Sequence, residues 1–212
     1  MEQNKIYRPV KQLSPEVARK IAAGEVIDRP NAIVRELLDN AIDSGAKSIT
    51  LEIAGGGIDK IRITDDGAGM TKEDLIACAK PHATSKITSE SDLLSLNTLG
   101  FRGEALASIA AVSRLEITTR RENNPAYHLE AQLTDEHIIT PSVLEKGTIV
   151  QSQSLFENIP ARRIFLKRPA SEANLCKQTF IEKSLPNPQI NFKFIIHNFH
   201  HLIFNQILSQ II

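Results

Sequence analysis

The chain has 212 residues, of which 42% are hydrophobic and 24% are charged, a composition typical of a globular protein. Its 25 basic residues balance its 25 acidic residues, so a protein that coats DNA through an overall basic surface is not indicated. The two cysteines, Cys78 and Cys176, form no CxxC pair, which disfavours a disulfide or zinc framework and favours a cytoplasmic setting. No run of about 18 apolar residues occurs in the sequence, so we expect no membrane span.

Two helices are predicted near the N-terminus. Ser14, Pro15 and Glu16 supply an N-cap and an N1 proline for the first, and we expect Gly24 to end it. The second begins at Arg29-Pro30 and runs to Gly45. Apolar residues cover one half of its circumference, as in a helix that packs against a core.

The other half of this second helix carries Glu36, Asn40 and Asp43 within a stripe of about 40° to 60°. Such a stripe is usually a solvated polar face. However, asparagine is a poor helix former, and an amide beside a carboxylate one turn away also suits Mg²⁺, which prefers oxygen ligands. A carboxylate next to the waters of such a cation can act as a general base.

The rest of the chain is predicted to alternate strands and helices irregularly, which favours an α+β fold with a largely antiparallel sheet. Gly55-Gly56-Gly57 is predicted to turn a hairpin between the first two strands. Pro186 and Pro188 mark a predicted boundary, with an ATP-binding domain at 1–186 and the start of a second domain at 187–212. The predicted strands are 48–54, 60–64, 115–119, 127–133, 148–155 and 191–197, and the predicted helices are 71–80, 102–112, 160–167 and 171–183.

A carboxylate and two glycines follow the second predicted strand in the segment Asp65-Asp66-Gly67-Ala68-Gly69. Asp-Gly is a strong turn signal, so a simple tight turn is one interpretation. The alternative is a binding site: the glycines let a flat ligand approach the backbone, and the carboxylate accepts a hydrogen bond from an exocyclic amino group such as that of adenine.

Two further segments carry possible phosphate contacts. Gly100 and Gly103 bracket Phe101-Arg102 directly before a predicted helix, whose N-terminal N–H groups suit an anion. A loop with a helix cap is an equally good interpretation. Thr84, Ser85 and Lys86 form a polar loop that is more often simply solvated. The sequence contains no Walker A motif, which excludes a standard P-loop enzyme.

Together, these segments resemble the N-terminal ATPase region of the MutL family of DNA mismatch repair proteins. The resemblance covers residues 10–185 and rests on IAAGEVIDRP, RELLDNAIDSGA, DDGAGM, HATSKI, GFRGEALASIAAVSRL and PARRIFL in this order. GFRGEALASI with IAAGEV upstream separates the MutL family from its superfamily relatives, which are topoisomerase ATPase subunits, the ninety-kilodalton heat-shock chaperone and sensor histidine kinases.

The resemblance implies a role for each matching residue. Glu36 matches the general base, Asn40 the Mg²⁺ ligand and Asp65 the carboxylate that binds the adenine amino group, with Gly67 and Gly69 shaping that site. The remaining ATP-binding positions are Thr84, Ser85, Lys86, Gly100, Phe101, Arg102, Gly103, Glu104, Ala105, Leu106 and Thr148. Asp43 has no assigned role, and we expect it to form a structural salt bridge.

The resemblance also implies a two-layer α/β sandwich, with helices on one face of a mixed sheet, and a Mg²⁺-dependent ATPase. In this family, ATP orders a lid and two ATPase regions then dimerise as a clamp that responds to MutS and DNA. We therefore expect ATP and Mg²⁺ as cofactors, a MutS-type sensor, DNA and a second copy of the chain as partners, no membrane partner, and a cytoplasmic, nucleoid-associated location.

Several residues depart from the family pattern. Pro81 replaces a usually basic residue, Ile159 replaces a threonine, and Ser152 and Ser154 interrupt a strand that is usually more apolar or acidic. Family members also continue into a second domain whose lysine reaches the γ-phosphate, so we expect weak ATP binding and slow hydrolysis. Two alternatives stay open: a non-enzymatic module that docks DNA or MutS through Arg162, Arg163, Lys167 and Arg168, and another ATPase of the same superfamily.

Overall fold

A computed structural model of the chain describes residues 11–80, 104–132 and 136–197. Within these ranges the strands are β1 (Ser48–Ala54), β2 (Lys60–Asp65), β3 (Arg114–Arg120), β4 (Ala126–Glu130), β5 (Ile138–Ser142), β6 (Gly147–Gln153) and β7 (Asn191–His197). They form one sheet in the order β5-β4-β3-β6-β2-β1-β7. β1 and β7 pair in parallel, whereas the other neighbouring pairs are antiparallel.

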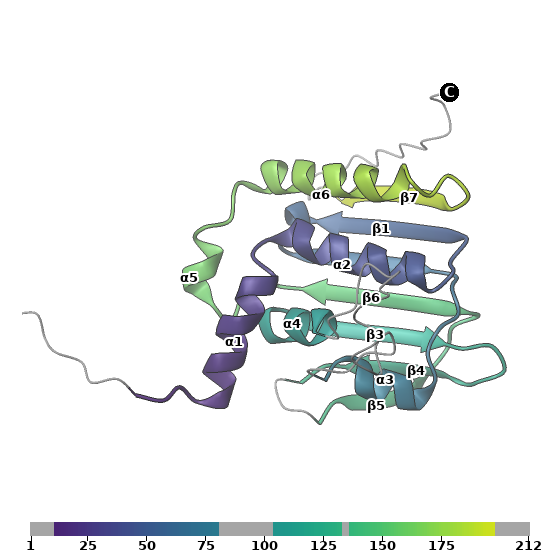
Figure 1. The fold of residues 1–212 in the computed structure, drawn as a ribbon, viewed down its shortest axis with the longest axis horizontal. Coiled ribbons are helices and arrows are strands. Elements are labelled where there is room, and N and C mark those ends of the chain that lie inside the picture. The colour runs from purple at the N-terminus through teal and green to yellow at the C-terminus, as the bar shows by residue number, and fades with distance from the viewer. Residues whose placement is uncertain (1–10, 81–103, 133–135, 198–212) are drawn as a thin grey trace, which may run out of the picture.

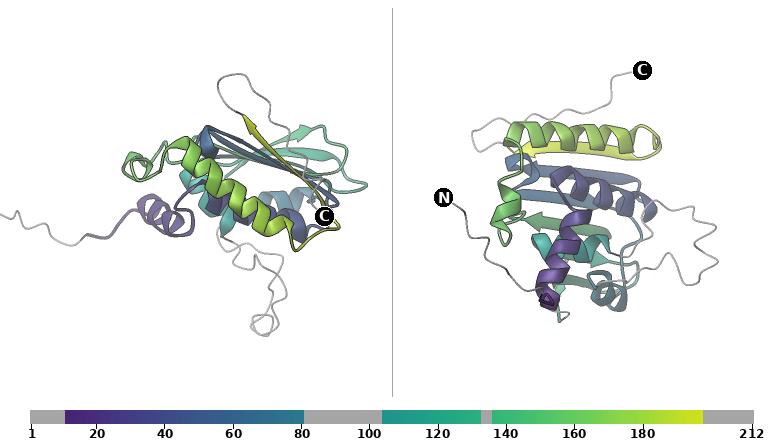
Figure 2. Two further views of the ribbon diagram at one scale, coloured as in Figure 1. Left: turned by 90° about the horizontal axis from the view of Figure 1, so that it is seen from above. Right: turned by 60° about the vertical axis from the view of Figure 1, so that its left-hand side comes forward.

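The helices form a second layer on one face of this sheet (Figure 1), and Figure 2 shows the two layers from above. They are α1 (Pro15–Val26), α2 (Pro30–Asp43), the 3-10 turn η1 (Gly55–Gly57), α3 (Lys72–Cys78), α4 (Ala105–Val112), α5 (Pro160–Arg163) and α6 (Pro169–Ser184). The predicted fold, a two-layer α/β sandwich with a mixed, mostly antiparallel sheet, is therefore confirmed. None of the helices in the described ranges is both long and apolar enough to cross a lipid bilayer.

The core lies between the two layers, and strand alternation explains which residues enter it. Ile49, Leu51 and Ile53 of β1 are fully buried, while the residues between them are only half-buried on the open face of the sheet. β2 and β3 show the same alternation. From the helix layer, α2 contributes Ile33, Val34, Leu37, Leu38 and Ala41.

Two local predictions about the fold are wrong for identifiable reasons. Gly24 lies inside α1, which ends at Val26. The glycine has a packing reason instead: the guanidinium of Arg162 occupies the space where a Cβ would be and donates to the Gly24 carbonyl oxygen. Strand β5 is absent from the sequence-based prediction. It is a sheet-edge strand that contains Pro141, and proline within a strand is tolerated mainly at an edge.

Strand β7 follows the proline pair and lies within the same sheet as the preceding strands. Ser48 of β1 pairs with Asn191, and the Asn191 N–H donates to the Lys47 carbonyl oxygen at 2.8 Å. Phe180 of α6 stacks on Phe194 with ring centroids 5.1 Å apart and meets Phe192 edge-on at 5.8 Å. The sequence shows no partner for residues 191–197, but the structure provides β1 and α6.

Candidate functional site

Asp65 is the last residue of β2 and its side chain faces the helix layer, where it is 8% exposed. The Gly67 N–H donates to its Oδ1 at 2.9 Å, and the hydroxyl of Ser44 lies 3.4 Å from the same oxygen. Burial raises the pKa of this carboxyl from 3.8 to about 6, against the opposing effect of hydrogen bonds from Gly67, Ser44 and the Thr148 N–H. The carboxylate is therefore ionised but poorly solvated at neutral pH.

Asp66, the adjacent acid, has a different environment. Its Oδ1 accepts the N–H groups of Lys47 and Ser48 at 2.7 and 2.9 Å, which ties the start of β1 to the end of β2. Burial alone would raise the pKa of Asp66, but these N–H groups bind the ionised form and the net shift is downward. Asp66 is thus a structural anchor, and Asp65 is the acid held next to the glycine loop.

The glycines beside Asp65 stand where protein atoms approach closely. A Cβ on Gly67 would collide with Ser44, and one on Gly69, at φ +66°, would collide with the Arg120 carbonyl oxygen. Gly147, at φ +92°, leaves equally little space beside the Asp65 backbone. The predicted importance of Gly67 and Gly69 thus has a reason within the fold itself: their neighbours occupy the space of a side chain.

Thr148 lies directly opposite Asp65 in the β2–β6 ladder, so the two side chains share the helix-facing side of the sheet. Thr119 lies directly opposite Thr148 in the β3–β6 ladder and is 1% exposed. Its hydroxyl accepts the Met70 N–H at 2.9 Å and lies 3.1 Å from both the Gly147 carbonyl oxygen and Thr148 Oγ1. Thr119 was not among the predicted site residues. The alternation of buried residues along β3 could have indicated that its side chain faces the helix layer.

Helix α2 runs past this end of the sheet. Its C-cap residue Ser44 contacts Asp65, and the Ser44 carbonyl oxygen accepts the Ala68 N–H at 3.0 Å. Glu36 and Asn40 lie two turns and one turn before Ser44, at i, i+4 and i+8 spacing, and both side chains are half-buried. The stripe of Glu36 and Asn40 therefore leads along α2 from the Asp65 carboxylate.

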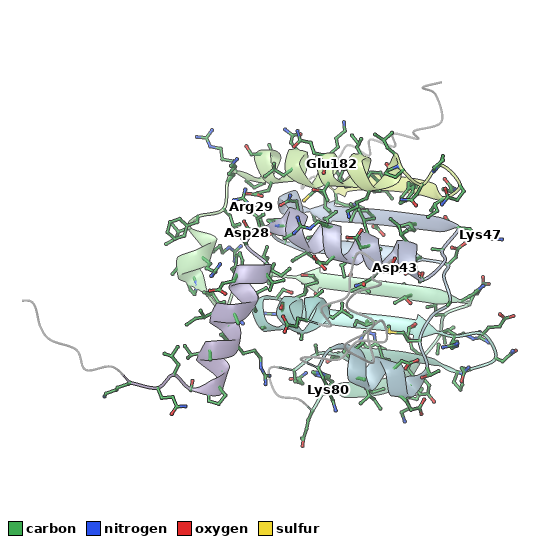
Figure 3. All side chains as sticks on the ribbon, viewed as in Figure 1. Asp28, Arg29, Asp43, Lys47, Lys80 and Glu182 are labelled. Carbon is green, nitrogen blue, oxygen red and sulfur yellow. The ribbon has the colours of Figure 1, made fainter. Side chains whose placement is uncertain are left out.

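Asp43, labelled in Figure 3, is exposed at the C-terminal end of α2, and its predicted salt bridge stays a prediction. The acid that α2 does bury is Asp39, on the flank that packs against α6. Nζ of Lys183 lies 2.7 and 2.8 Å from its two carboxylate oxygens. This pair escaped the sequence-based prediction because it joins residues far apart in the chain.

Helix α4 begins at Ala105 with Glu104 as its N-cap residue, and the Glu104 side chain makes no capping hydrogen bond. Ala105 and Leu106 thus belong to the first turn of a helix, as the phosphate-site hypothesis requires. The other predicted phosphate contacts, Thr84, Ser85, Lys86, Gly100, Phe101, Arg102 and Gly103, lie outside the described residues.

A cavity of about 400 Å³ lies at the other end of β3, away from Asp65. It is lined by residues at the start of β3, the end of β4 and the turn after β6, including Arg114, Glu116, Glu130 and Glu157. Arg114 and Glu157 pair with each other at 2.6 Å. Among the predicted site residues that the structure describes, none lines this cavity.

The helix-covered sheet, with a buried carboxylate and a glycine loop at the end of an inner strand, is the fold of a class of nucleotide-binding α/β sandwiches. The chain belongs to the family of histidine kinase-, DNA gyrase B- and HSP90-like ATPases, whose family model matches residues 28–157. Two curated relatives are DNA mismatch repair proteins MutL. That of Treponema pallidum is 49% identical over 96% of this chain and 34% of its own length, and that of Caldanaerobacter subterraneus is 47% identical over 86% and 31%.

Solved structures agree with this assignment. The N-terminal domain of a DNA repair protein is 27% identical with a TM-score of 0.75, over 89% of this chain and 54% of that chain. The Aquifex aeolicus MutL ATPase domain complexed with ADP is 25% identical with a TM-score of 0.65, over 85% and 65%. The resemblance to the MutL ATPase region is therefore confirmed, and the chain spans about a third of the length of the curated MutL relatives.

Proposed function

We propose that this chain is the ATP-binding and ATP-hydrolysing domain of a MutL-type DNA mismatch repair protein. The observation that carries the proposal is the buried carboxylate of Asp65, held by Gly67 N–H at the end of β2 beside a glycine loop. An ionised acceptor in this position complements the exocyclic amino group of adenine. The relative from Aquifex aeolicus whose ATPase domain was solved with ADP has the same fold.

Three groups of residues suit three parts of a nucleotide. Asp65 binds the base, and its carboxylate is held by the Gly67 N–H of the glycine loop. The N-terminus of α4, at Ala105 and Leu106, supplies N–H groups and a positive dipole end for the phosphates. The stripe of α2 that contacts the base site at Ser44 carries Asn40 and Glu36.

Mg²⁺ fits the oxygen chemistry of this stripe. The described residues contain no group of three or more His, Cys, Asp or Glu side chains suited to a metal. Asn40 would hold the cation through its carboxamide oxygen, and Mg²⁺ commonly keeps several water ligands. When bound, it offsets the negative charge of the phosphates.

Glu36 acts as the general base of the hydrolysis. Its half-buried carboxylate accepts a proton from a water that attacks the γ-phosphorus, while the bond to the bridging β–γ oxygen breaks and ADP leaves. Asn40, the proposed Mg²⁺ ligand, lies one turn further along the same face of α2. We assign clamp closure, dimerisation on ATP binding and the response to a MutS-type sensor and DNA to the whole MutL-type protein.

The alternative, a non-enzymatic module that docks DNA, has less structural support than an ATPase domain. Arg162, the first of the four basic residues in its proposed patch, donates to the Gly24 carbonyl oxygen of α1. This guanidinium holds α5 against α1, and Arg163, Lys167 and Arg168 remain for a nucleic acid. A neutral net charge also predicts weak non-specific DNA binding.

The test is a titration of ATP with and without Mg²⁺, read as the melting temperature, together with phosphate release. A ligand of the native state raises the melting temperature, so a rise with ATP is expected. Glu36→Ala should keep this rise and lower hydrolysis by about 10² to 10⁴-fold. Asp65→Ala should abolish the rise, and Glu157→Ala, far from the site, should change neither. No rise at millimolar ATP for the wild type would refute the proposal.

A further inference from the structure

Thr119 is a buried polar residue that no part of the proposed function uses. Its hydroxyl, 1% exposed, has three polar neighbours: the Met70 N–H at 2.9 Å, the Gly147 carbonyl oxygen at 3.1 Å and Thr148 Oγ1 at 3.1 Å. Met70 follows directly on the glycine loop, and Gly147 and Thr148 open β6. One side chain therefore links the glycine loop to the strand that pairs with Asp65.

The sheet register places Asp65, Thr148 and Thr119 side by side on three neighbouring strands, all facing the helix layer. We call these three residues the polar row. Ile49 and Tyr127 continue the row on either side, opposite Asp65 and Thr119 respectively, so apolar and aromatic neighbours flank it. Such an environment makes the direction of each hydrogen bond matter, because an unpaired polar atom there is costly.

One assignment of the hydrogens makes all three contacts hydrogen bonds at once. A threonine hydroxyl has one hydrogen to donate and two lone pairs that accept. The Thr119 hydrogen goes to the Gly147 carbonyl oxygen, and one lone pair accepts the Met70 N–H. The other lone pair is left to accept from Thr148, so the Thr148 hydroxyl donates its hydrogen to Thr119.

Thr148 consequently has only lone pairs left to offer on its Asp65 side. The Asp65 carboxylate, ionised, is also an acceptor only. Two acceptors side by side suit an amino group, which has hydrogens to donate, and repel a carbonyl oxygen in the same place. A purine with a 6-amino group is therefore favoured over a purine with a 6-oxo group.

We propose that Thr119 is a positioning residue that fixes the Thr148 hydroxyl as an acceptor and thereby sets the preference of the base site for a 6-amino over a 6-oxo purine. The inference rests on the proposed nucleotide site and names a determinant of its specificity. Thr119 acts through Thr148 and the glycine loop, not by touching the base. Without its hydroxyl, Thr148 is free to turn and donate to a carbonyl oxygen.

The experiment compares the affinities of the chain for ADP and inosine diphosphate by calorimetric titration, since these ligands differ at the 6-position. The wild type should prefer ADP. Thr119→Val removes the hydroxyl at nearly constant volume and should lower the ratio of the two affinities about tenfold, the usual effect of one buried hydrogen bond. Thr119→Ser keeps the hydroxyl and should keep the ratio.

Thr118→Val is the matched control. Thr118 is the preceding residue of β3, and its hydroxyl lies 2.9 Å from His128 Nδ1 on the open face of the sheet. Its removal should leave the ratio unchanged. Thr119→Ala also removes the hydroxyl and should lower the ratio in the same way, so it tests the inference should Thr119→Val not fold.

Two results for the variants would overturn the role of Thr119. If Thr119 only stabilises the fold, its variants weaken ADP and inosine diphosphate in equal proportion, and the unchanged ratio overturns the inference. A Thr119→Ser variant that loses the preference also overturns it, because the hydroxyl is then not the determinant. If the wild type binds ADP but the variants keep its ratio of affinities, only this inference fails and the proposed function stands. If the wild type binds neither ADP nor inosine diphosphate, the inference and the proposed function are both refuted.

Discussion

The hydroxyl of Ser44 lies 3.4 Å from Oδ1 of Asp65 and 2.7 Å from the carbonyl oxygen of Ala41. The hydroxyl has one hydrogen and its shorter contact is with Ala41, so its hydrogen bond to Asp65 is the weaker of the two. The C-cap of α2 is thus joined to the Asp65 carboxylate of the proposed base site. This contact favours the ionised carboxylate against the effect of burial.

Replacement of Ser44 by alanine should therefore raise the pKa of Asp65 further above about 6, because one of the groups that lower it is lost. The carboxyl ¹³C resonance of Asp65, followed through a pH titration, measures this shift. Ser113→Ala is the matched control, since Ser113 is the C-cap of α4 and its hydroxyl also donates to a carbonyl oxygen of its own helix, that of Ile109. A downward shift in Ser44→Ala would contradict the interpretation.

Asp65→Asn should stabilise the chain at neutral pH while it weakens ATP binding. The pKa of Asp65 is about 6 in the folded chain against 3.8 ordinarily, so the folded state binds the proton more tightly. The contribution of Asp65 to the free energy of unfolding thus falls as pH rises from about 4 to about 6, by at most about 3 kcal/mol. Urea unfolding at pH 4 and pH 8 should show a gain for Asp65→Asn at pH 8 that is smaller or absent at pH 4.

Gly69→Ala should destabilise the chain by more than about 2 kcal/mol, because its φ of +66° and the carbonyl oxygen of Arg120 both exclude a Cβ. Gly45→Ala is the control: its φ of +74° is similar, but no atom lies within 4 Å of the added Cβ, so only the backbone strain of about 1 kcal/mol is expected. The free energy of unfolding in urea measures both. An equal loss of unfolding free energy in the two variants would show that the backbone at Arg120 moves away from the added Cβ without loss of stability.

Lys183→Met should lower the free energy of unfolding by about 3 kcal/mol, because it leaves the buried carboxylate of Asp39 without its cation. The double variant Lys183→Met, Asp39→Leu should regain much of this loss. Arg114→Met, which breaks the exposed pair with Glu157, is the control and should cost less than about 1 kcal/mol. A double variant as unstable as the single one would argue against an unpaired charge as the cause.

Local signals in the sequence predicted much of the fold. Ser14 caps its helix as expected and accepts the Val17 N–H. Thr71, the first residue of the predicted helix 71–80, is the N-cap of α3 and accepts the Asp74 N–H. Alternation in 48–54 and 60–64 predicted β1 and the core of β2. These features depend on neighbours within a few residues, and that is why pattern and capping rules capture them.

The rest depends on contacts between distant segments. The Asp39–Lys183 pair and the packing of Arg162 on Gly24 exist only once the helices are assembled. Ser152, which the sequence marks as an interruption of a strand, is 2% exposed and donates to Ser113 Oγ at 2.8 Å, so it ties β6 to the end of α4. Ser154, the other serine, lies beyond β6 at φ 55°, in the turn that follows.

The parallel pairing of β1 with β7 determines when the sheet can be completed. During synthesis β1 and β2 emerge early and can form their hairpin at once, but the outer edge of β1 stays unpaired until Asn191–His197 has left the ribosome. An unpaired edge is a template for association with other chains. Slow elongation through residues after Lys183 would therefore prolong the period in which nascent chains can aggregate.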